Sequence, residues 1–353
     1  MKENKKTIFQ DVCPTDKTYK EWDMLGFNFI LDNFLHVLRE IEPPMTIGLY
    51  GQWGSGKTSM LQGLAEELKK EHCFVVSFDA WKYRKEQDLM LPLLCKIRNT
   101  ILLQKKEPLD KIPVVLEKIF FNLTTQMLKN KTGVDFHQLM NDGKNRYETY
   151  VDNVDQIEGE YKNFIEDLVK DKKLYVFIDN LDRCLPDIVV NLLEDISSFL
   201  SIKGVPCVYC LVMDKNNVIK AINHRYPDFN GVHYLEKIVQ IGLSMPKLGD
   251  GHKTEWRQFF QKRYMKAINS EHASLFGHDS ISVFKELEKI KGIYTEDGLL
   301  NNARRIERFI NKWLVLCAMK RIGHTEDVGN VCLYVFGILL KEYFPVAYNE
   351  IKD

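Results

Sequence analysis

One short segment of the chain has the residue types and the spacing of a phosphate-binding loop. Residues 51–58 are Gly-Gln-Trp-Gly-Ser-Gly-Lys-Thr, which matches the pattern G-x-x-x-x-G-K-[ST]. Glycines at these positions let the backbone turn tightly, so that successive N–H groups point inward at phosphate oxygens. The pattern therefore predicts a site for the phosphates of a nucleotide. The predicted contacts are Gly51, Gln52, Trp53, Gly54, Ser55, Gly56, Lys57, Thr58 and Ser59.

Two of these side chains would carry the chemistry. Lys57 can neutralise the β- and γ-phosphates, which makes it a catalytic candidate, and Thr58 offers a hydroxyl group to Mg²⁺. The flanks also fit, because residues 46–50 form an apolar run typical of a strand and residues 61–68 carry apolar side chains at helical spacing. The N-terminal end of that helix would add positive potential toward a bound anion. We therefore interpret the loop as functional rather than as a chance glycine turn.

A second acidic element follows the apolar run at residues 174–178, which leads directly into Asp179, Asn180, Leu181, Asp182 and Arg183. A carboxylate at the end of a buried strand can hold Mg²⁺, directly or through water, across from the hydroxyl of the phosphate loop. Together with that loop, the pattern predicts Asp179 as a metal ligand, with Thr58, and as a catalytic residue.

The next two charged residues each have two interpretations. Asp182 is the nearest carboxylate after Asp179 and could polarise the attacking water, or it could cap the next helix or pair with Arg183. Arg183 could stabilise charge that develops on a phosphate, in its own subunit or a neighbouring one, or it could be a structural ion-pair partner. We predict Asp182 and Arg183 as candidate catalytic residues.

The composition excludes several classes of protein. The chain has 353 residues with 49 basic and 49 acidic side chains, and 45% of its residues are hydrophobic. This is the balance of a folded soluble protein, and zero net charge gives no overall basic excess for nucleic-acid binding, although a local patch remains open. No apolar run approaches the ~18 residues of a membrane span, and no signal-peptide core follows the N-terminus. We expect a soluble, cytoplasmic protein.

The eight cysteines are scattered through apolar segments, which favours reduced, buried thiols. Cys207 and Cys210 have the spacing of a metal-binding or redox pair, but they lie in an apolar run. Because side chains three apart on a strand point to opposite faces, we predict that the two sulfur atoms diverge. The histidines form no zinc-hydrolase motif.

The order of the apolar runs predicts an α/β fold. Strand-like runs alternate with helical patterns, which is typical of a parallel sheet covered by helices on both faces. The expected strands are residues 46–50, 74–78, 174–178, 207–213 and 238–243. We predict an N-terminal lead-in with an amphipathic helix over residues 1–45, a core over 46–246 and a C-terminal helical domain over 247–353. Residues 88–170 would form a helical insertion, whose most apolar part, 112–128, we interpret as an amphipathic helix rather than a membrane contact.

Several segments resemble the KAP family of P-loop NTPases. Phe78-Asp79-Ala80-Trp81 resembles the family's F-N/D-A-W segment, and residues 179–186 resemble its D-D-L-D-R-C-x-P stretch. Three later segments also match in order, so that the resemblance spans roughly residues 20–315. They are residues 211–214, 234–240 and 302–311.

The resemblance implies an ATPase of the additional-strand (ASCE) class, related to the STAND and AAA+ groups, with a five-stranded parallel sheet and a helical domain behind it. It implies ATP and Mg²⁺ as the bound groups. It also implies that Asp214 lies at a sensor-like position near the γ-phosphate and that Arg304 occupies the family's N-P-R element, where Ala303 replaces the proline. Asn180 stands where relatives commonly have a second Asp; if that acid is the base, hydrolysis here would be slow or absent. Many relatives carry membrane helices in the insertion, and this chain has none.

The arginines near residue 304 can be placed on a predicted helix without the family. Its apolar face would contain Ile306, Phe309, Ile310, Trp313 and Cys317, while Arg304 and Arg308 lie on the opposite face and Arg305 at the flank. These guanidinium groups could meet nucleotide phosphates when the helical domain closes, or they could form a solvated basic face.

Three further side chains have a structural interpretation as well as a nucleotide-binding one. Lys237 could meet phosphates in the same way as the arginines, or it could pair with Glu236 at the surface. For Trp53 and Trp81 we favour packing over base stacking: Trp53 over the loop or a neighbouring element, and Trp81 in the core or between domains.

These inferences together predict a Mg²⁺-dependent switch protein that binds and hydrolyses ATP. The resemblance implies a role in signalling or anti-phage defence, through a separate effector protein or through its own homo-oligomer. The competing hypothesis is a non-hydrolysing, nucleotide-dependent scaffold, which Asn180 favours. A nucleic-acid-associated ATPase has weak support, because the net charge is zero.

Overall fold

The computed structural model describes residues 18–23, 26–86, 88–105, 159, 161–163, 165–166, 169–170, 172–197, 201–246, 259, 302–318, 337–339 and 341. The chain divides into two compact units, and each is described by itself. The sheet unit comprises residues 31–51 and 60–244. The loop unit comprises residues 1–30, 52–59 and 245–353. The apolar segment 112–128 lies outside the described residues.

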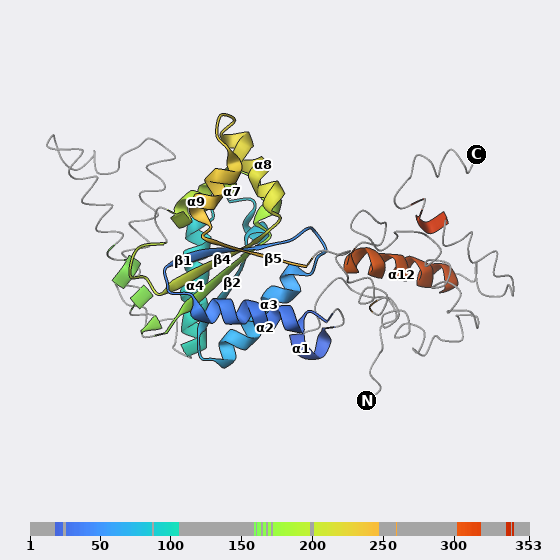
Figure 1. Cartoon of the computed structure of the whole chain (residues 1–353), viewed down its shortest axis with the longest axis horizontal. Helices are drawn as coiled ribbons and strands as arrows, with labels where there is room; N and C mark the ends of the chain where they lie inside the picture. The colour runs from blue at the N-terminus through green and yellow to red at the C-terminus, as the bar shows by residue number, and fades with distance from the viewer. Residues whose placement is uncertain are drawn as a thin grey trace. The chain divides into compact units, whose positions relative to one another are not determined.

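The sheet unit is built on a sheet of five parallel strands (Figure 1). The strand order is β2-β3-β4-β1-β5. Every residue of β3 and β4 is buried, because these strands are covered on both faces. Strand β4 lies between β1 and β3, which is the additional strand that defines the predicted class. The predicted α/β fold with a five-stranded parallel sheet is confirmed. The strands are β1 (Met45–Tyr50), β2 (Phe74–Asp79), β3 (Leu174–Asp179), β4 (Cys207–Met213) and β5 (Ile241–Ser244).

The predicted start of the last strand is wrong. Residues up to Ile238 belong to helix α9 (Gly231–Ile238), and β5 begins only at Ile241. The side chain of Asn230 caps this helix by accepting hydrogen bonds from two backbone N–H groups at 2.9 and 3.3 Å. Ile238 is apolar because it is on the buried side of α9, and the sequence pattern joined it to the strand that follows.

Helices cover both faces of the sheet. Residues 31–40 of α2 (Asn28–Glu40) and 60–70 of α3 (Lys57–Lys70) lie on one face, and α7 (Pro186–Asp195), α8 (Lys215–Arg225) and α9 lie on the other (Figure 1). The second group packs in a single cluster with alternate residues of β2, β3 and β4. Because the strands bury both faces, the sheet holds the ends of its strands in fixed positions.

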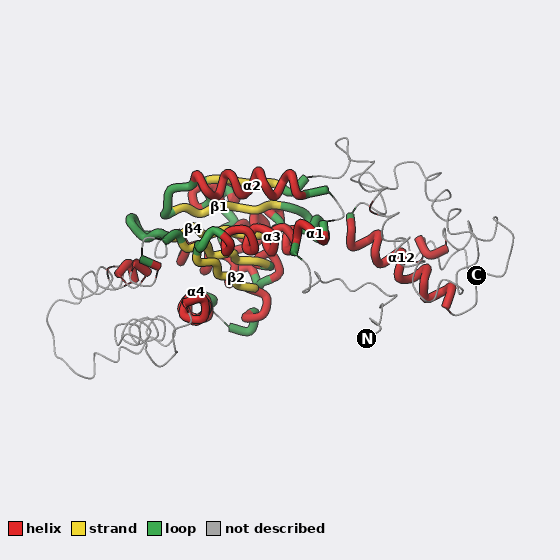
Figure 2. The backbone as a smooth tube through the Cα atoms, turned by 90° about the horizontal axis from the view of Figure 1, so that it is seen from below, coloured by secondary structure: helices red, strands yellow, loops and turns green. Residues whose placement is uncertain are grey.

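Helix α4 (Met90–Lys105), the first element of the predicted insertion, lies beside β2, the strand at one edge of the sheet (Figure 2). Gln104 in its last turn makes both hydrogen bonds that a neighbouring strand would make to Val75: its amide donates to the carbonyl oxygen at 2.8 Å and its Oε1 accepts from the N–H at 3.4 Å. The exposed edge of β2 is thereby partly satisfied by a side chain.

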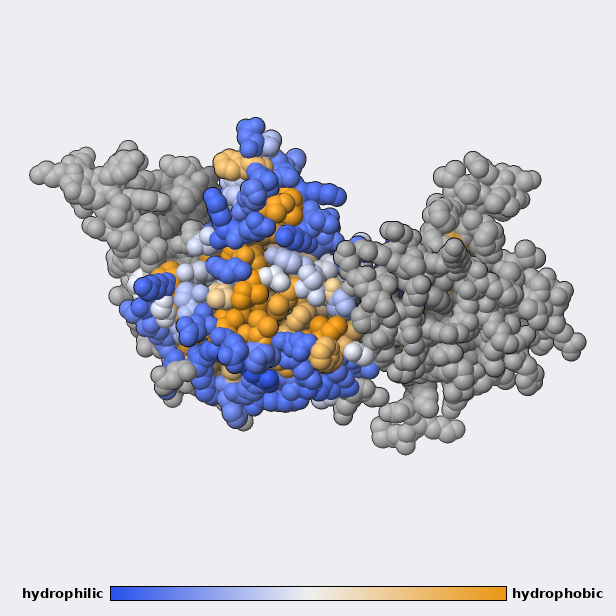
Figure 3. All heavy atoms as spheres, viewed as in Figure 1, coloured by the Kyte–Doolittle hydropathy of each residue, from blue (hydrophilic) through white to orange (hydrophobic). Residues whose placement is uncertain are grey.

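The opposite edge of the sheet is less covered. Ile241 and Leu243 of β5 are only half-buried, and Figure 3 shows hydrophobic side chains at the surface between α2 and α8. β5 therefore contributes less to the core than β3 or β4.

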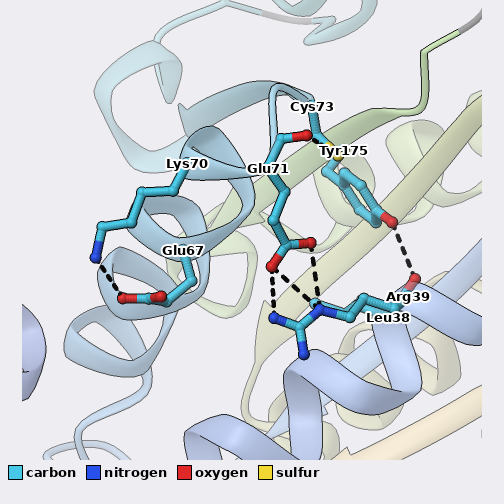
Figure 4. Close-up of polar contacts among 7 residues, drawn as sticks. All are labelled: Leu38, Arg39, Glu67, Lys70, Glu71, Cys73 and Tyr175. Carbon is cyan, nitrogen blue, oxygen red and sulfur yellow. Dashed lines mark hydrogen bonds and ion pairs between the residues drawn. The ribbon is translucent and has the colours of Figure 1, made fainter.

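The amino ends of the strands are held by a group of polar contacts (Figure 4). Arg39 at the end of α2 forms an ion pair with Glu71, which follows α3. The hydroxyl of Tyr175 donates to the carbonyl oxygen of Leu38 at 2.9 Å, and Lys173 donates to the carbonyl oxygen of Arg39 at 2.8 Å. These contacts join both helices of one face to strand β3.

In the loop unit, the described helices are α1 (Tyr19–Trp22) and α12 (Ala303–Ala318). No helix among the described residues of either unit is long and apolar enough to cross a membrane. The proposed division of the chain into three regions stays a prediction.

Candidate nucleotide-binding site

Strand β1 leads directly into the phosphate loop. The N–H of Gly51 donates to the carbonyl oxygen of Met213 at the end of β4, with an N–O distance of 3.2 Å. The loop therefore leaves the carboxyl edge of the sheet, and α3 begins at Lys57. Gly54 and Gly56 have φ angles of 86° and 91°, which L side chains rarely adopt. This is the strand, loop and helix that the sequence predicts.

The polar groups of the loop fit a phosphate ligand. The Nζ atom of Lys57 donates to the carbonyl oxygen of Gln52 at 3.1 Å, so the lysine side chain lies over its own loop. The Oγ atom of Ser55 is buried and has no hydrogen-bond partner among the described residues. A buried hydroxyl group without a partner is costly, and a phosphate oxygen would satisfy it. Thr58 is exposed, in the first turn of α3.

Within the loop unit, the start of α12 lies against this loop. Asn302 caps α12 by accepting a hydrogen bond from the N–H of Arg305 at 3.0 Å. The same side chain lies so close to Gly54 that a Cβ atom there would be 2.8 Å from its Oδ1 atom. The guanidinium group of Arg304 lies 5.7 Å from the ring centroid of Trp53, within the range of a cation–π contact. The structure thus brings Arg304 to the phosphate loop.

The predicted faces of α12 are seen where its side chains are described. Ile306, Phe309 and Ile310 are buried, whereas Arg308 is exposed. The side chains of Trp313 and Cys317 lie outside the described residues. Trp53 is 65% exposed, and its contact is with the neighbouring element α12, in line with the predicted packing.

Asp179 and Asp79 lie side by side at the carboxyl ends of β3 and β2. The two residues are paired in the strand register, and Asp179 is 7% exposed. The backbone N–H of Asn180 donates to Oδ1 of Asp179 at 2.8 Å, and the side-chain amide of Asn180 donates to Oδ1 of Asp79 at 3.0 Å. A carboxylate this deeply buried suits a cation as a partner, because burial of a charge is unfavourable without compensation.

Asp182 does not cap the next helix. Helix α7 begins at Pro186, and its N-cap residue Leu185 makes no side-chain cap bond. Asp182 lies instead in a single 3₁₀ turn, η3 (Leu181–Arg183), and is half-buried. Its capping alternative is therefore wrong, and its role as a base stays a prediction.

Arg183 lies over an aromatic ring. Its guanidinium carbon is 5.8 Å from the ring centroid of Trp81, and that of Arg84 is 4.5 Å from the same ring. Trp81 is 41% exposed and follows β2 in the turn η1 (Ala80–Tyr83), at the surface of the sheet unit. Its predicted packing in the core is therefore wrong, and packing between domains stays a prediction. Nearby, burial first and then Asp79 and Asp182 raise the pKa of Cys184 to about 11.

Asp214 caps α8, because its Oδ1 atom accepts a hydrogen bond from the N–H of Asn216 at 3.0 Å. It directly follows β4 at the same edge of the sheet as Asp179. Lys237 is exposed in the last turn of α9. The sensor role of Asp214 and a phosphate role of Lys237 stay predictions.

The two cysteines of β4 diverge as predicted. Both are buried free thiols, and only Cys207 belongs to the side-chain cluster under α7 and α8. Burial raises the pKa of Cys207 to about 12. Across the described ranges, no three His, Cys, Asp or Glu side chains gather as metal ligands would.

Sequence reasoning missed Asp79 as a possible site residue. In the sequence it was only one residue of the motif at residues 78–81, which overlaps the end of β2. Its position beside Asp179 depends on the pairing of β2 with β3, two strands about a hundred residues apart in the chain. The available signal was that both strands end in an acid.

The comparison with protein families decides the classification. The model of the KAP family P-loop domain matches residues 27–318, most of the chain. The chain belongs to the KAP family. In P-loop proteins generally, the phosphate loop is the part that binds the nucleotide phosphates, and in this KAP domain it is residues 51–58.

The KAP chain is similar to three kinds of curated protein. It is 41% identical over 54 residues to the kinase D-interacting substrate of 220 kDa from rat and human, which covers 15% of this chain and 3% of that protein. It is 23% identical over 329 residues to the phage T7 exclusion protein of Escherichia coli, covering 83% of this chain and 42% of that protein. It is also 25% identical over 174 residues to protein MJ0182 of Methanocaldococcus jannaschii, covering 39% of this chain and 90% of that protein. The chain therefore spans less than half of the first two relatives.

Among solved structures, the KAP chain is similar to the ORC2 protein of Aeropyrum pernix, with 14% identity, a TM-score of 0.42, and coverage of 93% of this chain and 71% of that one. It is also similar to domain III of the replication initiator DnaA of Thermotoga maritima, with 13% identity, a TM-score of 0.42, and coverage of 94% and 98%. Likenesses this distant do not bear on function.

Proposed function

We propose that this KAP chain is a switch that binds ATP with Mg²⁺ at the loop of residues 51–59 and hydrolyses it. The observation that carries the proposal is the loop itself. It has two positive-φ glycines, a buried Ser55 hydroxyl group without a partner among the described residues, and the ammonium group of Lys57 lying over the loop backbone. Together these groups make a cationic, donor-rich cradle of the kind that binds polyphosphate. ATP rather than GTP follows from the family.

The metal ligands in this proposal are Thr58 and Asp179. The hydroxyl group of Thr58 is in the first turn after the loop, and Asp179 supplies a buried carboxylate at the end of β3. Oxygen ligands of this type suit Mg²⁺. When bound, the ion would neutralise charge on the terminal phosphates. Asp182, Arg183 and Asp214 complete the set of candidate catalytic residues, as a base, a charge stabiliser and a sensor.

The switching element in this proposal is the start of α12. Arg304 and Asn302 both contact the loop, through Trp53 and Gly54. A ligand shifts a conformational equilibrium when it binds one state better than the other. A polyphosphate in the loop would compete with Trp53 for the guanidinium group of Arg304, so nucleotide state would change how α12 is held.

The first experiment separates binding from hydrolysis. Calorimetry with ATP and Mg²⁺ gives affinity, and steady-state phosphate release gives turnover, for the wild type and Lys57→Ala. We expect the substitution to weaken binding about 100-fold or more, because a charge-assisted phosphate contact is lost. Lys69→Ala removes an exposed lysine from the same helix and should match the wild type. Wild-type turnover no greater than that of Lys57→Ala would exclude ATP hydrolysis as the function of the chain.

A second function stays in view because of one residue. Asn180, directly after Asp179, is an amide and cannot accept a proton from water. A chain that binds ATP but does not release phosphate would be a nucleotide-dependent scaffold. In that case the same calorimetry would show normal affinity, and assembly state measured by light scattering would still change with nucleotide.

The biological role we propose is anti-phage defence or signalling in the cytoplasm, through a partner protein or a homo-oligomer. It is supported by the similarity to the phage T7 exclusion protein, of which this chain spans 42%. Phage challenge of cells that express the wild type or Lys57→Ala tests it, with plaque counts as the readout. Protection by the chain alone, without any host partner, would overturn the separate-effector version.

A further inference from the structure

The carboxyl ends of β2 and β3 carry a hydrogen-bonded pair of one carboxylate and one amide. The side-chain amide of Asn180 donates to Oδ1 of Asp79 at 3.0 Å, across the two strands. Asp79 is level with Asp179 in the sheet, because the strand register pairs them directly. Neighbouring strands lie about 4.8 Å apart, so Asp79 is the acid next to the metal-ligand candidate along the same edge.

Asn180 is held in an unusual conformation by these bonds. Its φ angle is 60°, in the left-handed region that residues other than glycine seldom occupy. Its backbone N–H donates to Asp179 and its side chain to Asp79, so both acids help to fix it. Backbone strain of this kind persists where the surroundings hold it, and it gathers at functional sites. The amide orients Asp79 and takes one oxygen of the carboxylate, Oδ1.

The second carboxylate oxygen of Asp79, Oδ2, is the atom that this arrangement leaves available to accept a proton. No hydrogen bond to Oδ2 is made by the described residues, and the side chain is half-buried rather than enclosed. A general base must be a group that can accept a proton, held within hydrogen-bond reach of the attacking water. Asn180 fails the first condition because it is an amide. Asp182 is three residues beyond Asp179, in the turn η3 and off the strand ends.

We propose that Asp79 is the general base of the hydrolysis, held in position by Asn180. This inference rests on the proposed function. Asp79 removes a proton from the attacking water as the water oxygen forms its bond to the γ-phosphorus. The bond from that phosphorus to the β–γ bridging oxygen breaks, and ADP keeps its electron pair. Asp79 then releases the proton to solvent, so that the products are ADP, phosphate and one proton.

The variants isolate the carboxylate from the fold. Asp79→Asn keeps the shape and can still accept the hydrogen bond from Asn180, and Asp79→Ser removes the carboxylate with a smaller side chain. Asp182→Asn tests the competing base. The exchange Asp79→Asn with Asn180→Asp restores one carboxylate and one amide in the opposite order. Asp187→Asn, an exposed acid of α7 that pairs with Arg225, is the matched control.

Three measurements are made on each variant. Calorimetry with a non-hydrolysable ATP analogue and Mg²⁺ reports ground-state binding. Single-turnover phosphate release reports the chemical step. Affinity for ADP with Mg²⁺ and aluminium fluoride, which imitates the transferring phosphoryl group and its attacking water, reports transition-state binding without turnover. Asp79→Asn and Asp79→Ser should bind the ATP analogue as the wild type does. Their turnover should fall by about 100-fold or more, and their affinity for the fluoride complex should fall too.

The remaining arms decide between the two acids. We expect Asp182→Asn to lose less turnover than Asp79→Asn, the exchanged pair to recover at least part of the lost rate, and Asp187→Asn to match the wild type. Wild-type turnover in Asp79→Asn, or the larger loss in Asp182→Asn, overturns the base while leaving the proposed function intact. A wild-type protein that binds no nucleotide overturns the proposed function itself, and one that binds without turnover overturns the hydrolysis and the base together.

Discussion

The two edges of the one parallel sheet use polar side chains in opposite ways. At the amino edge, Arg39 forms an ion pair with Glu71 (Figure 4). Lys173 donates there to the backbone carbonyl oxygens of Arg39 and Ile41, at the end of α2. At the carboxyl edge, like charges lie together, since Asp79 is beside Asp179 in the register. The first arrangement stabilises a fold, and the second is unfavourable to it unless a cation or a reaction makes use of the acids.

The backbone shows the same contrast. At the carboxyl edge, Asn180 adopts a φ angle of 60°, and the acidic residue Asp179 is buried. At the amino edge Tyr175 satisfies a backbone carbonyl oxygen with an ordinary hydrogen bond. We infer that substitutions at the amino edge change stability and leave activity intact, and that those at the carboxyl edge do the reverse.

The largest effect should follow from Asp179→Asn. The amide has the same shape but carries no charge for Mg²⁺, so turnover should fall about 100-fold or more. Because the substitution also removes a buried charge beside Asp79, the free energy of unfolding should stay unchanged or rise. Phosphate release and urea unfolding measure the two quantities. A large loss of stability would show that Asp179 holds the fold, and the comparison of the two edges would break.

The converse substitution is Tyr175→Phe at the amino edge. It leaves the carbonyl oxygen of Leu38 without its donor, in a buried position, which should lower the free energy of unfolding by about 1–3 kcal/mol. Turnover per folded molecule should not change. Urea unfolding and phosphate release on the same preparation test this. Lower turnover at full folding would mean that the amino edge also serves the site.

A second group of neighbouring acids tests whether like charges always lower stability. Burial, and then Asp88 and Glu194, raise the pKa of Asp195 at the end of α7 to about 7. The unfolded value is near 3.9, so the folded state holds the proton more tightly. The contribution of Asp195 to the free energy of unfolding is therefore fully present below about pH 4, and it is lost as the pH rises toward 7.

Asp195→Asn should remove that loss. We expect it to stabilise the protein by about 1–2 kcal/mol at pH 8, less than the whole shift implies because the side chain is partly exposed, and to have little effect at pH 4. Unfolding by urea across this range measures the difference. An Asp195→Asn protein with the same pH dependence as the wild type would contradict the assignment.

The phosphate loop could be predicted in full because its signal is local. The spacing from Gly51 to Thr58, the strand before it and the helix after it all lie within one short stretch. The strands could be predicted from continuous apolar runs. Strands that are buried on both faces do not alternate apolar and polar residues, so they appear in the sequence as such runs. The exception was Ile238, where the end of a helix and the start of a strand are both apolar.

The pair of Asp79 and Asn180 could not be predicted, because its two residues are 101 positions apart and meet only through strand order. Asn180 by itself indicated a missing base, and the sequence offered no reason to look for a substitute on β2. The contact of Arg304 with Trp53 had the same character: the helical spacing gave the face of the arginine, and only the fold gave the ring that it meets.

The smallest effect should come from the ion pair of Arg39 with Glu71. Both side chains are partly exposed, at 47% and 35%, so solvent screens their attraction even though two nitrogen atoms of the guanidinium group contact the carboxylate. A double-mutant cycle with Arg39→Ala and Glu71→Ala, read by urea unfolding, should give a coupling of about 0.2–1 kcal/mol that shrinks in high salt. Lys70, which is exposed, and Glu67, which is partly buried, form a second ion pair on α3 and provide the comparison cycle. A coupling free energy several times larger for Arg39 and Glu71, with unchanged turnover, would still mean that the amino edge serves stability. A change in turnover would contradict that role.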